Sequence, residues 1–233
     1  MKCIILAGGF GTRLFPLTLN KAKALLDYKD KPLLTHLVEN IPQELEILVS
    51  INLRFEDDFR EWQQSIDRQV KLLLEEANHN KQKRGAVSAL NTWIKREGIT
   101  EDLLVIAGDN YFGFDLSHFI DSYDGKNTLA AIYDVGDFDK ASHFGVVYLN
   151  THKIDKIMEK PAITDSSLVA TACYLIPPRV FIYINQYCSE HKRDNLGNLI
   201  AYLVTIDQVE AYVFKGRWFD IGTELKGSIN KRS

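Results

Sequence analysis

The sequence predicts an α/β fold built on a mixed β-sheet, and two observations carry this prediction. Short runs rich in β-branched residues, bounded by glycine or polar clusters, alternate with stretches of helical periodicity, as expected for βαβ units around a parallel sheet. From Thr128 to Ile176, strand-like runs follow one another with little helix between them. Antiparallel or mixed pairing is therefore expected in that part of the chain.

The predicted elements follow from these patterns in chain order. Strands are expected at Lys2–Ala7, Glu46–Ile51, Val70–Leu74, Leu103–Ala107, Thr128–Tyr133, Gly145–Leu149, Lys153–Met158, Val169–Ile176 and Val209–Phe214. Helices are expected at Leu33–Asn40, Glu56–Ile66, Ala86–Arg96, Leu116–Ser122, Pro178–Gln186 and Leu196–Leu203. Pro32 suits the first turn of the first helix, and Asn195 suits the N-cap of the last.

Length and composition indicate one globular domain over residues 1–233. Hydrophobic residues make up 45% and charged residues 25% of the chain, which excludes the disordered and collagen-like classes. Apolar runs such as Leu103–Ala107 are far shorter than the roughly 18 residues of a membrane-spanning helix, and the N-terminus enters a glycine loop directly without a signal-peptide pattern. No membrane association is therefore predicted.

The charge balance and the cysteine content limit the classes of binding partner and the cellular compartments that we expect. The 28 Lys and Arg residues against 31 Asp and Glu give a net charge of −3, without the basic footprint of a nucleic-acid-binding protein. The three cysteines are far apart and form no CxxC pair, so neither a disulfide framework nor a zinc ribbon is indicated. A cytoplasmic location is expected, and a homo-oligomer remains open.

The first predicted strand ends in a glycine-rich loop with the sequence LAGGFGTRLFPLT at residues 6–18. Such loops let backbone N–H groups close on phosphate oxygens. The Gly-Lys-Ser/Thr ending of a Walker A loop is absent, and Leu14 stands where a dinucleotide fingerprint needs its last glycine. Pro16 would also break a helix begun at Gly11, which argues against a nicotinamide cofactor.

Cations and carboxylates accompany this loop. Arg13 lies inside it and Lys23 follows, and both suit phosphate oxygens. Asp109 follows a buried strand, and ligands of parallel sheets bind at the carboxyl ends of strands, although a turn or capping role would also explain this residue. With Asp220 it could form the usual incomplete Mg²⁺ site, completed by triphosphate oxygens and water.

Five motifs in this order resemble the signature of the sugar-1-phosphate nucleotidylyltransferases and span nearly the whole chain. They are the glycine loop, Lys23 in KAKALL, Gly108-Asp109-Asn110, Glu159-Lys160-Pro161 and Trp218-Phe219-Asp220-Ile221-Gly222. The resemblance implies a three-layer Rossmann-like mixed sheet with helices on both faces, of the nucleotide-diphospho-sugar transferase type. Alanine at position 22 departs from the family, which usually has proline before the lysine.

The resemblance also implies roles for individual residues. Arg13, Lys23 and Asp109 would be catalytic, and Asp109 with Asp220 would hold Mg²⁺. Lys160 would bind the sugar phosphate, Glu159 a sugar hydroxyl and the backbone of Gly145 the sugar. The remaining implied substrate-binding residues are Leu6, Ala7, Gly8, Gly9, Gly11, Thr12, Gly85 and Thr171.

Details of the likeness bear on the substrates. Relatives commonly have glycine at the position of Ala172, and the best-known thymidylyltransferases have glutamine in the neighbourhood occupied here by Glu75 and Glu76. The segment Lys83–Ala86 stands where the family has a base-recognition loop. The large aromatic side chains of Trp218 and Phe219 are expected to pack in the core rather than stack on a base.

The expected reaction joins a nucleoside triphosphate and a sugar-1-phosphate with release of pyrophosphate. The resemblance favours dTTP and glucose-1-phosphate, partly through the stretch Arg193–Ile200. A UTP- or GTP-dependent enzyme for another sugar-1-phosphate and a non-catalytic sugar-nucleotide-binding relative remain as alternatives.

Overall fold

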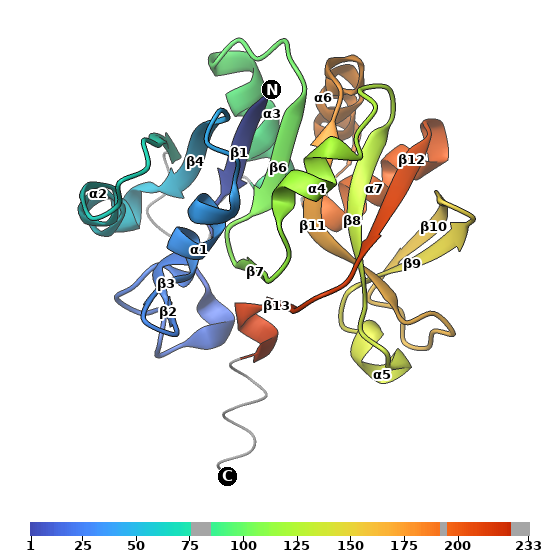
Figure 1. Ribbon diagram of the computed structural model, residues 1–233, viewed down its shortest axis with the longest axis horizontal. Helices are drawn as coiled ribbons and strands as arrows, with labels where there is room; N and C mark the ends of the chain where they lie inside the picture. The colour runs from blue at the N-terminus through green and yellow to red at the C-terminus, as the bar shows by residue number, and fades with distance from the viewer. Residues whose placement is uncertain (76–84, 192–194, 225–233) are drawn as a thin grey trace. The chain divides into compact units, whose positions relative to one another are not determined.

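The computed structural model describes residues 1–75, 85–191 and 195–224 (Figure 1). These residues form two compact units. Of the described residues, the glycine-loop unit holds 2–75, 106–116 and 216–224, and the strand-rich unit holds Met1 and residues 85–105, 117–191 and 195–215. The chain passes from one unit to the other within strand β6 (Leu103–Ala107).

Three parallel strands form the sheet of the glycine-loop unit. Strand β4 (Glu46–Asn52) pairs on one side with β1 (Lys2–Leu6) and on the other with β5 (Lys71–Glu75). Six consecutive residues of β4, from Ile47 to Asn52, are buried, as expected for a central parallel strand covered on both faces. The end of β6 joins the same edge, because the amide of Gly108 donates to the carbonyl of Leu6 at 2.9 Å.

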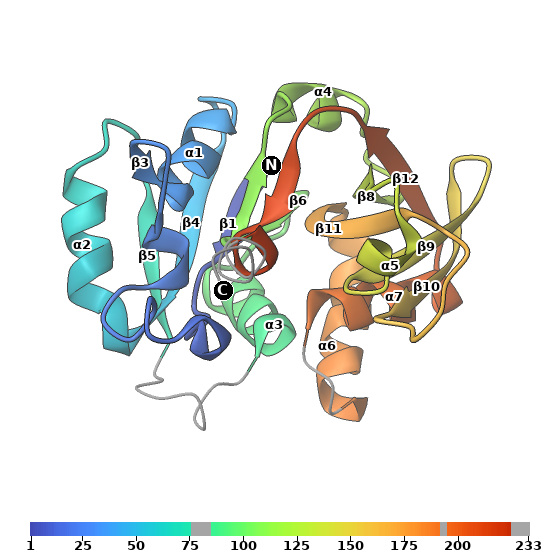
Figure 2. The same ribbon diagram turned by 90° about the horizontal axis from the view of Figure 1, so that it is seen from below.

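Two helices of this unit lie side by side (Figure 2). The indole Nε1 of Trp62 in α2 (Glu56–Gln64) donates to the hydroxyl of Thr35 in α1 (Leu33–Asn40) at 2.9 Å. Both helices agree with the sequence prediction, although α2 ends two residues early. Pro32 does not lie in the first helical turn as predicted, because its extended backbone (ψ 141°) places it at the end of a short strand.

Short elements that the sequence patterns did not reveal complete the unit. They are the hairpin of β2 (Asp27–Tyr28) and β3 (Lys31–Pro32), the antiparallel pair of β7 (Asn110–Phe112) and β13 (Trp218–Asp220), and the 3-10 turns Thr12–Leu14, Lys23–Leu25 and Leu53–Phe55. Strands of two or three residues are too short to show an alternating pattern.

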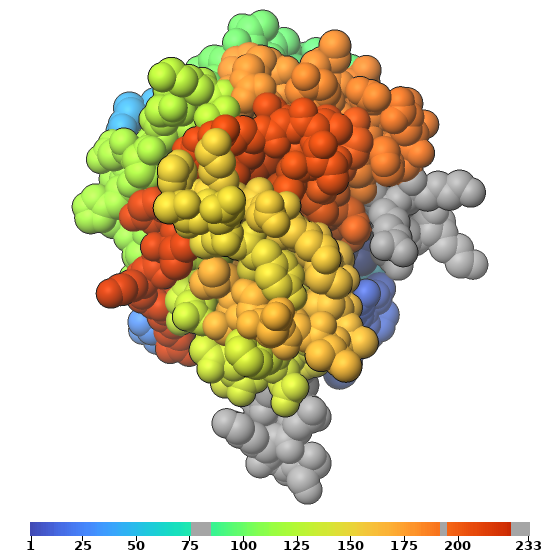
Figure 3. All heavy atoms as spheres, turned by 90° about the vertical axis from the view of Figure 1, so that its right-hand side faces the viewer, coloured from blue at the N-terminus to red at the C-terminus, as the bar shows by residue number. Residues whose placement is uncertain are grey.

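The strand-rich unit contains a sheet that closes on itself. Its order is β11 (Leu168–Ile176), β8 (Thr128–Asp134), β12 (Val209–Phe214), β10 (Lys153–Glu159) and β9 (Gly145–Asn150), and β9 pairs again with β11. Figure 3 shows the hairpin of β9 and β10 in yellow beside β12 in orange-red. The pairs among the strands between Thr128 and Ile176 are antiparallel, and only the β12–β8 pair is parallel among these pairings, so the predicted antiparallel or mixed pairing is confirmed.

Helices α6 and α7 pack on each other in this unit, and α3 contacts both. Helix α3 (Ala86–Arg96) has the predicted bounds, and α7 (Leu196–Ile206) runs three residues further than predicted. A 3-10 turn (Pro178–Val180) precedes α6 (Phe181–Glu190), and α4 (Leu116–Asp121) and α5 (Phe138–Ala141) are short. The predicted N-cap is confirmed, because Asn195 Oδ1 accepts from the amide of Asn198 at 2.8 Å.

No helix in the described parts of the chain combines the length and the apolar composition needed to cross a bilayer.

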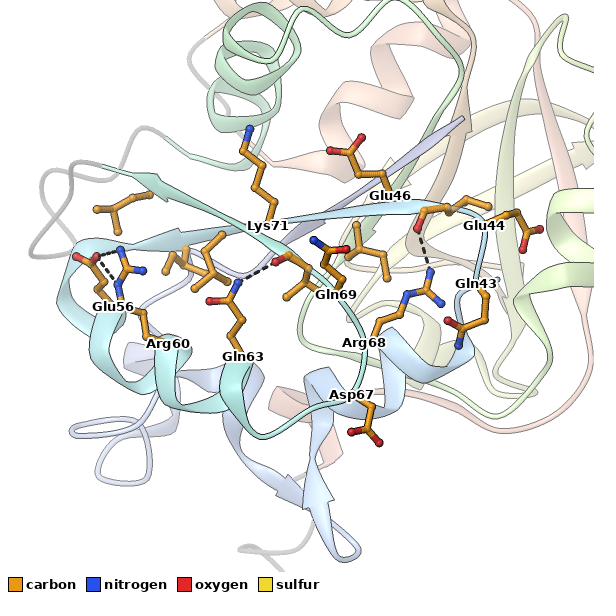
Figure 4. A pocket seen from close by; sticks show the side chains of 16 residues that line it. Gln43, Glu44, Glu46, Glu56, Arg60, Gln63, Asp67, Arg68, Gln69 and Lys71 are labelled. Carbon is orange, nitrogen blue, oxygen red and sulfur yellow. Dashed lines mark hydrogen bonds and ion pairs between the residues drawn. The ribbon is translucent and has the colours of Figure 1, made fainter.

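A hollow of about 800 Å³ is lined by residues of α2, of β4 and β5, and of the loops that precede the two strands (Figure 4). The guanidinium of Arg68 donates to the backbone carbonyls of Ile41, Pro42 and Leu45 at 3.3, 2.6 and 3.0 Å. Arg60 pairs with Glu56 on the same helix. Arg68 therefore fastens the loop before β5 to the loop before β4.

We expect Arg68→Ala to destabilise the protein by about 1–3 kcal/mol, because three backbone carbonyls lose their donor. Urea unfolding followed by circular dichroism measures this change. Arg54→Ala is the matched control, since that exposed guanidinium donates to the single carbonyl of Leu19, and a smaller loss is expected. Equal stability of wild type and Arg68→Ala would contradict the fastening role.

Candidate active site

The glycine loop begins where β1 ends and turns sharply at Gly11. Gly11 has a φ of +62°, and a Cβ there would lie 2.9 Å from the side chain of Thr18. Thr18 is fully buried, and its hydroxyl donates to the carbonyl of Gly11 at 2.7 Å. This hydrogen bond therefore joins the two ends of the turn Gly11–Thr18. The loop continues into a 3-10 turn, where a dinucleotide-binding fold would have a helix.

Arg13 and Thr12 lie on that turn and are exposed. A Cβ at Gly9 would meet nothing within 4 Å, whereas a Cβ at Gly8 would collide with the side chain of Glu75. One face of the loop is thus open and the other is packed against the end of β5. An exposed guanidinium beside open glycine backbone is suited to a bound anion.

Lys23 lies between two carboxylates in the same unit. Its Nζ is 2.6 Å from Asp109 Oδ2 and 3.1 Å from Asp220 Oδ1. The lysine side chain is 16% exposed and each aspartate side chain 32% exposed. The structure therefore brings together three predicted site residues from distant parts of the chain.

The backbone before Lys23 explains why alanine can replace the usual proline there. Ala22 is fully buried and has a φ of −62°, which is the angle that a proline ring imposes. Alanine thus keeps the conformation that leads Lys23 to the carboxylates.

Asp220 is positioned by a short antiparallel ladder. It lies opposite Asn110 in the β13–β7 pair, and the amide of Ile221 donates to the carbonyl of Asp109 at 2.9 Å. The indole of Trp218 donates to the side chain of Asn110 at 2.9 Å. The aromatic ring of Phe219 stacks on Tyr111 with ring centroids 5.1 Å apart. Trp218 and Phe219 are 8% and 6% exposed, which confirms the prediction that they pack in the core.

Gly222 was not predicted as a site residue, yet it allows the carboxylates to converge. Its amide donates to Asp220 Oδ1 at 2.5 Å, and a Cβ at this position would lie 2.9 Å from both that oxygen and Lys23 Nζ. A side chain would therefore displace either the carboxylate or the ammonium. A glycine two residues after the aspartate is the sequence signal that could have identified it.

The pKa values of Lys23 and Asp220 are both raised in this cluster. Burial alone would lower the pKa of Lys23, but the negative charges and hydrogen bonds of Asp109 and Asp220 outweigh burial and raise it. Burial and the neighbouring charge of Asp109 raise the pKa of Asp220. One ammonium thus compensates two carboxylates only in part, so a further cation at this place would be favourable.

The residues present fit a magnesium ion. Both carboxylates reach one small cation, the ammonium of Lys23, so their oxygens are close enough to share a metal ion. Within the described residues there is no group of three or more His, Cys, Asp or Glu side chains that could hold a metal. Two carboxylates completed by phosphate oxygens and water are the usual ligand set of Mg²⁺.

A second group of predicted residues gathers in the strand-rich unit. Gly145 lies opposite Glu159 in the β9–β10 pair, and a Cβ at Gly145 would lie 3.1 Å from Glu159 Oε2. A Cβ at Gly197, near the start of α7, would collide with the same carboxylate. Two glycines therefore make room for Glu159, and Gly197 was not among the predicted site residues.

Residues with left-handed backbone directly follow the predicted site residues Glu159 and Thr171. Lys160 has a φ of +49°, its side chain is 52% exposed, and its amide donates to the carbonyl of Phe144. Ala172 has a φ of +55° within an irregularity of the β11–β8 pairing, which gives a physical reason for the glycine that relatives have there. The hydroxyl of Thr171 is buried and donates to the carbonyl of Ala131.

Gly85 has a φ of +97° at the start of α3. Glu76, Lys83, Arg84 and Arg193 lie outside the described residues, as do most of the expected base-recognition loop and the first residues of the Arg193–Ile200 stretch.

A folded chain with this arrangement is a nucleotide-diphospho-sugar transferase in fold. Residues 2–225 match the model of the nucleotidyl transferase family, and the chain belongs to that family. The fold aligns with a Bacillus anthracis protein assigned as a glucose-1-phosphate thymidylyltransferase, at 25% identity and a TM-score of 0.83 over 100% of this chain and 94% of the other. A UDP-glucose pyrophosphorylase aligns with a TM-score of 0.76 at 22% identity, over 100% and 99% of the two chains.

Relatives by sequence carry several nucleotide specificities. Mannose-1-phosphate guanylyltransferase 1 of Arabidopsis thaliana is 27% identical over 95% of this chain and 61% of its own length. A UTP–glucose-1-phosphate uridylyltransferase of Haloferax volcanii is 30% identical over 78% of this chain and 74% of its own length. The chain spans about three fifths of the length of several of the relatives that it matches.

We expect Lys23→Met to bind Mg²⁺ or Mn²⁺ about tenfold more tightly than the wild type when no nucleotide is present, because the competing ammonium is gone. Without metal, the variant should be about 1–3 kcal/mol less stable, since two carboxylates then face each other unpaired. Isothermal titration with Mn²⁺ and thermal unfolding with and without Mg²⁺ measure the two effects.

Lys31→Met is the control, because it removes a lysine that pairs with Glu39 on the surface of the same unit. Unchanged metal affinity in Lys23→Met would contradict competition between the ammonium and the metal ion.

Proposed function

We propose that this protein transfers a nucleotidyl group from a nucleoside triphosphate to a sugar-1-phosphate. The observation that carries the proposal is the convergence of Lys23, Asp109 and Asp220 beside the glycine loop. Family membership supports the same reaction class.

In the proposed reaction, an oxygen of the sugar phosphate attacks the α-phosphorus of the triphosphate. A new P–O bond forms there, the bond to the β-phosphate oxygen breaks, and pyrophosphate leaves with the bonding electrons. The attacking phosphate loses its second proton near about pH 6, so no general base is needed. The task of the protein is therefore to align two polyanions and to stabilise charge as pyrophosphate departs.

The chain's own residues supply distinct parts of this task. Arg13 is exposed at the loop and would hold the triphosphate. Lys23 would neutralise a phosphate once the lysine ammonium leaves the two carboxylates. Asp109 and Asp220 would then hold Mg²⁺, which screens phosphate charge when bound. Lys160 and Glu159 would bind the phosphate and a hydroxyl of the sugar.

Two pairs of nucleotide and sugar phosphate are candidates for the substrates. The sequence resemblance favours dTTP with glucose-1-phosphate, and the match to the Bacillus anthracis structure agrees with it. The names of several sequence relatives favour GTP with mannose-1-phosphate. A non-catalytic relative would be expected to lose a carboxylate or a phosphate-binding cation, whereas this chain keeps both.

A cytoplasmic location is part of the proposal. It is supported by the cysteines at positions 3, 173 and 188, none of which is joined in a disulfide among the described residues.

The proposal is tested by incubating the purified protein with Mg²⁺, five nucleoside triphosphates and several sugar-1-phosphates, with pyrophosphate release as the readout. One or a few productive pairs are expected. Arg13→Ala and Asp109→Asn should each lower kcat by about 10²–10³, because each removes a preorganised charge or ligand. Silence across the panel would favour the non-catalytic alternative.

Asp30→Asn is the matched control, because Asp30 is exposed in the turn between β2 and β3. Its rate should equal that of the wild type. Near-normal turnover by folded Arg13→Ala or Asp109→Asn would contradict the assigned roles.

A further inference from the structure

One aromatic side chain in the glycine-loop unit, that of Tyr28, contacts two short strands of the candidate site. Its ring centroid lies 4.7 Å from the ring of Tyr111 in β7 and 4.8 Å from the ring of Phe219 in β13. Centroid distances of roughly 4.5–7 Å are favourable for aromatic pairs. With the stacking of Phe219 on Tyr111, the three rings form one cluster that joins β2 to the antiparallel pair of β7 and β13 (Figure 1).

Each of the three rings lies within five residues of one charged side chain along the sequence. The pairs are Tyr28 and Lys23, Tyr111 and Asp109, and Phe219 and Asp220. Most of the residues between the members of a pair belong to a 3-10 turn or to paired strands, so they have little freedom to adjust. Contacts among the rings therefore constrain the spacing of the three charged groups.

Strand geometry places the aromatic cluster and the second carboxylate on opposite faces of the β7–β13 pair. Neighbouring residues of a strand point to opposite faces, as Phe219 and Asp220 do in β13. The ring of Phe219 is buried, whereas Asp220 is partly exposed. A two-stranded ribbon is marginally stable by itself and needs a packed face. Packing of Tyr28 on this face therefore helps to fix the direction in which Asp220 points.

Further contacts hold the ring of Tyr28 in place. The guanidinium carbon of Arg217 lies 5.4 Å from the centroid of Tyr28 and 5.3 Å from that of Phe219. The ring of His36 packs edge-on against Tyr28 at 5.6 Å, and its Nε2 donates to the backbone carbonyl of Tyr28 at 2.9 Å. The position of the Tyr28 ring is therefore set by the protein itself.

We propose that Tyr28 is a positioning residue, whose ring sets the spacing of Lys23, Asp109 and Asp220. The inference deepens the proposed nucleotidyl transfer and rests on it for the function of those three groups. Without the ring, β13 shifts relative to the 3-10 turn that carries Lys23. The ammonium then leaves the carboxylates and becomes accessible, and the carboxylates lose the spacing at which they share a cation.

Acylation of lysine side chains by acetic anhydride, located by mass spectrometry, tests the inference without metal or substrate. In the wild type, Lys23 should react slowly, because its side chain is 16% exposed and pairs with two carboxylates. In Tyr28→Leu, we expect the rate at Lys23 to rise about tenfold, because the aromatic contacts are lost and a void remains. Lys2 is the internal reference, since it is 24% exposed, pairs with Glu46 in the same unit and should keep its rate.

Two further variants show whether the ring at position 28 is responsible. Tyr28→Phe keeps the ring, and Lys23 should react as it does in the wild type. Tyr202→Leu is the matched control in the strand-rich unit, because it removes a half-buried ring that also packs against a histidine and another aromatic side chain. Its rate at Lys23 should equal that of the wild type.

Arg217→Met perturbs the cluster from its exposed side. It removes the cation above two rings, and we expect the rate at Lys23 to rise about threefold. If Tyr28→Leu does not fold, this variant decides the question, because an unchanged rate at Lys23 in Arg217→Met then overturns the inference.

Turnover gives a second readout, which a change in stability alone would not move. At saturating substrate concentrations, Tyr28→Leu should lower kcat about 10- to 100-fold while the KM for the sugar phosphate stays the same, because misplaced charges act on the reacting phosphates. Tyr28→Phe should restore most of the lost rate.

The outcomes separate this inference from the proposed function. Equal rates at Lys23 in the wild type and folded Tyr28→Leu, a parallel rise at Lys2, or an unchanged kcat overturns the positioning role even if the protein makes a nucleotide sugar. A selective rise at Lys23, with no turnover of any sugar-1-phosphate by the wild type, supports the positioning role while overturning the proposed function.

Discussion

The ion pairs of Lys23 with Asp109 and Asp220 are the constraint on which the glycine-loop unit depends. Two carboxylates at 32% side-chain exposure would repel each other without a cation between them. The β7–β13 ladder, the stacking of Phe219 on Tyr111 and the absence of a side chain at Gly222 all hold the second aspartate where the lysine can reach it. The ammonium thus lies between the two carboxylates and compensates their charge in part.

The polar groups of this unit differ in how firmly the core holds them. Ser50 and Asn52 are fully buried and hold Glu75 and Gly8, while Arg13 stands exposed on its 3-10 turn. Groups that are fixed by the core lose little conformational entropy if they take part in binding.

The strand-rich unit obtains its special positions from backbone geometry. Closure of its sheet through the β9–β11 pairing brings Gly145 level with Ala170, two residues before Ala172, which has left-handed backbone. Lys160 also has left-handed backbone directly after the carboxylate that Gly145 and Gly197 accommodate. Such conformations persist only where the surrounding sheet requires them, which is typical of binding sites.

The amino-acid sequence by itself determined the long elements and the motifs. The strand Leu103–Ala107 and the helix Ala86–Arg96 have the predicted bounds, because a run of apolar residues and a helical spacing of apolar residues can each be recognised within a short stretch of sequence. The closeness of Lys23, Asp109 and Asp220, the need for glycine at positions 8 and 222, and the carboxylate of Glu75 against the loop were decided by the tertiary structure. Each of these features depends on contacts at one sheet edge between chain segments that are far apart in the sequence. A local sequence pattern does not predict such contacts.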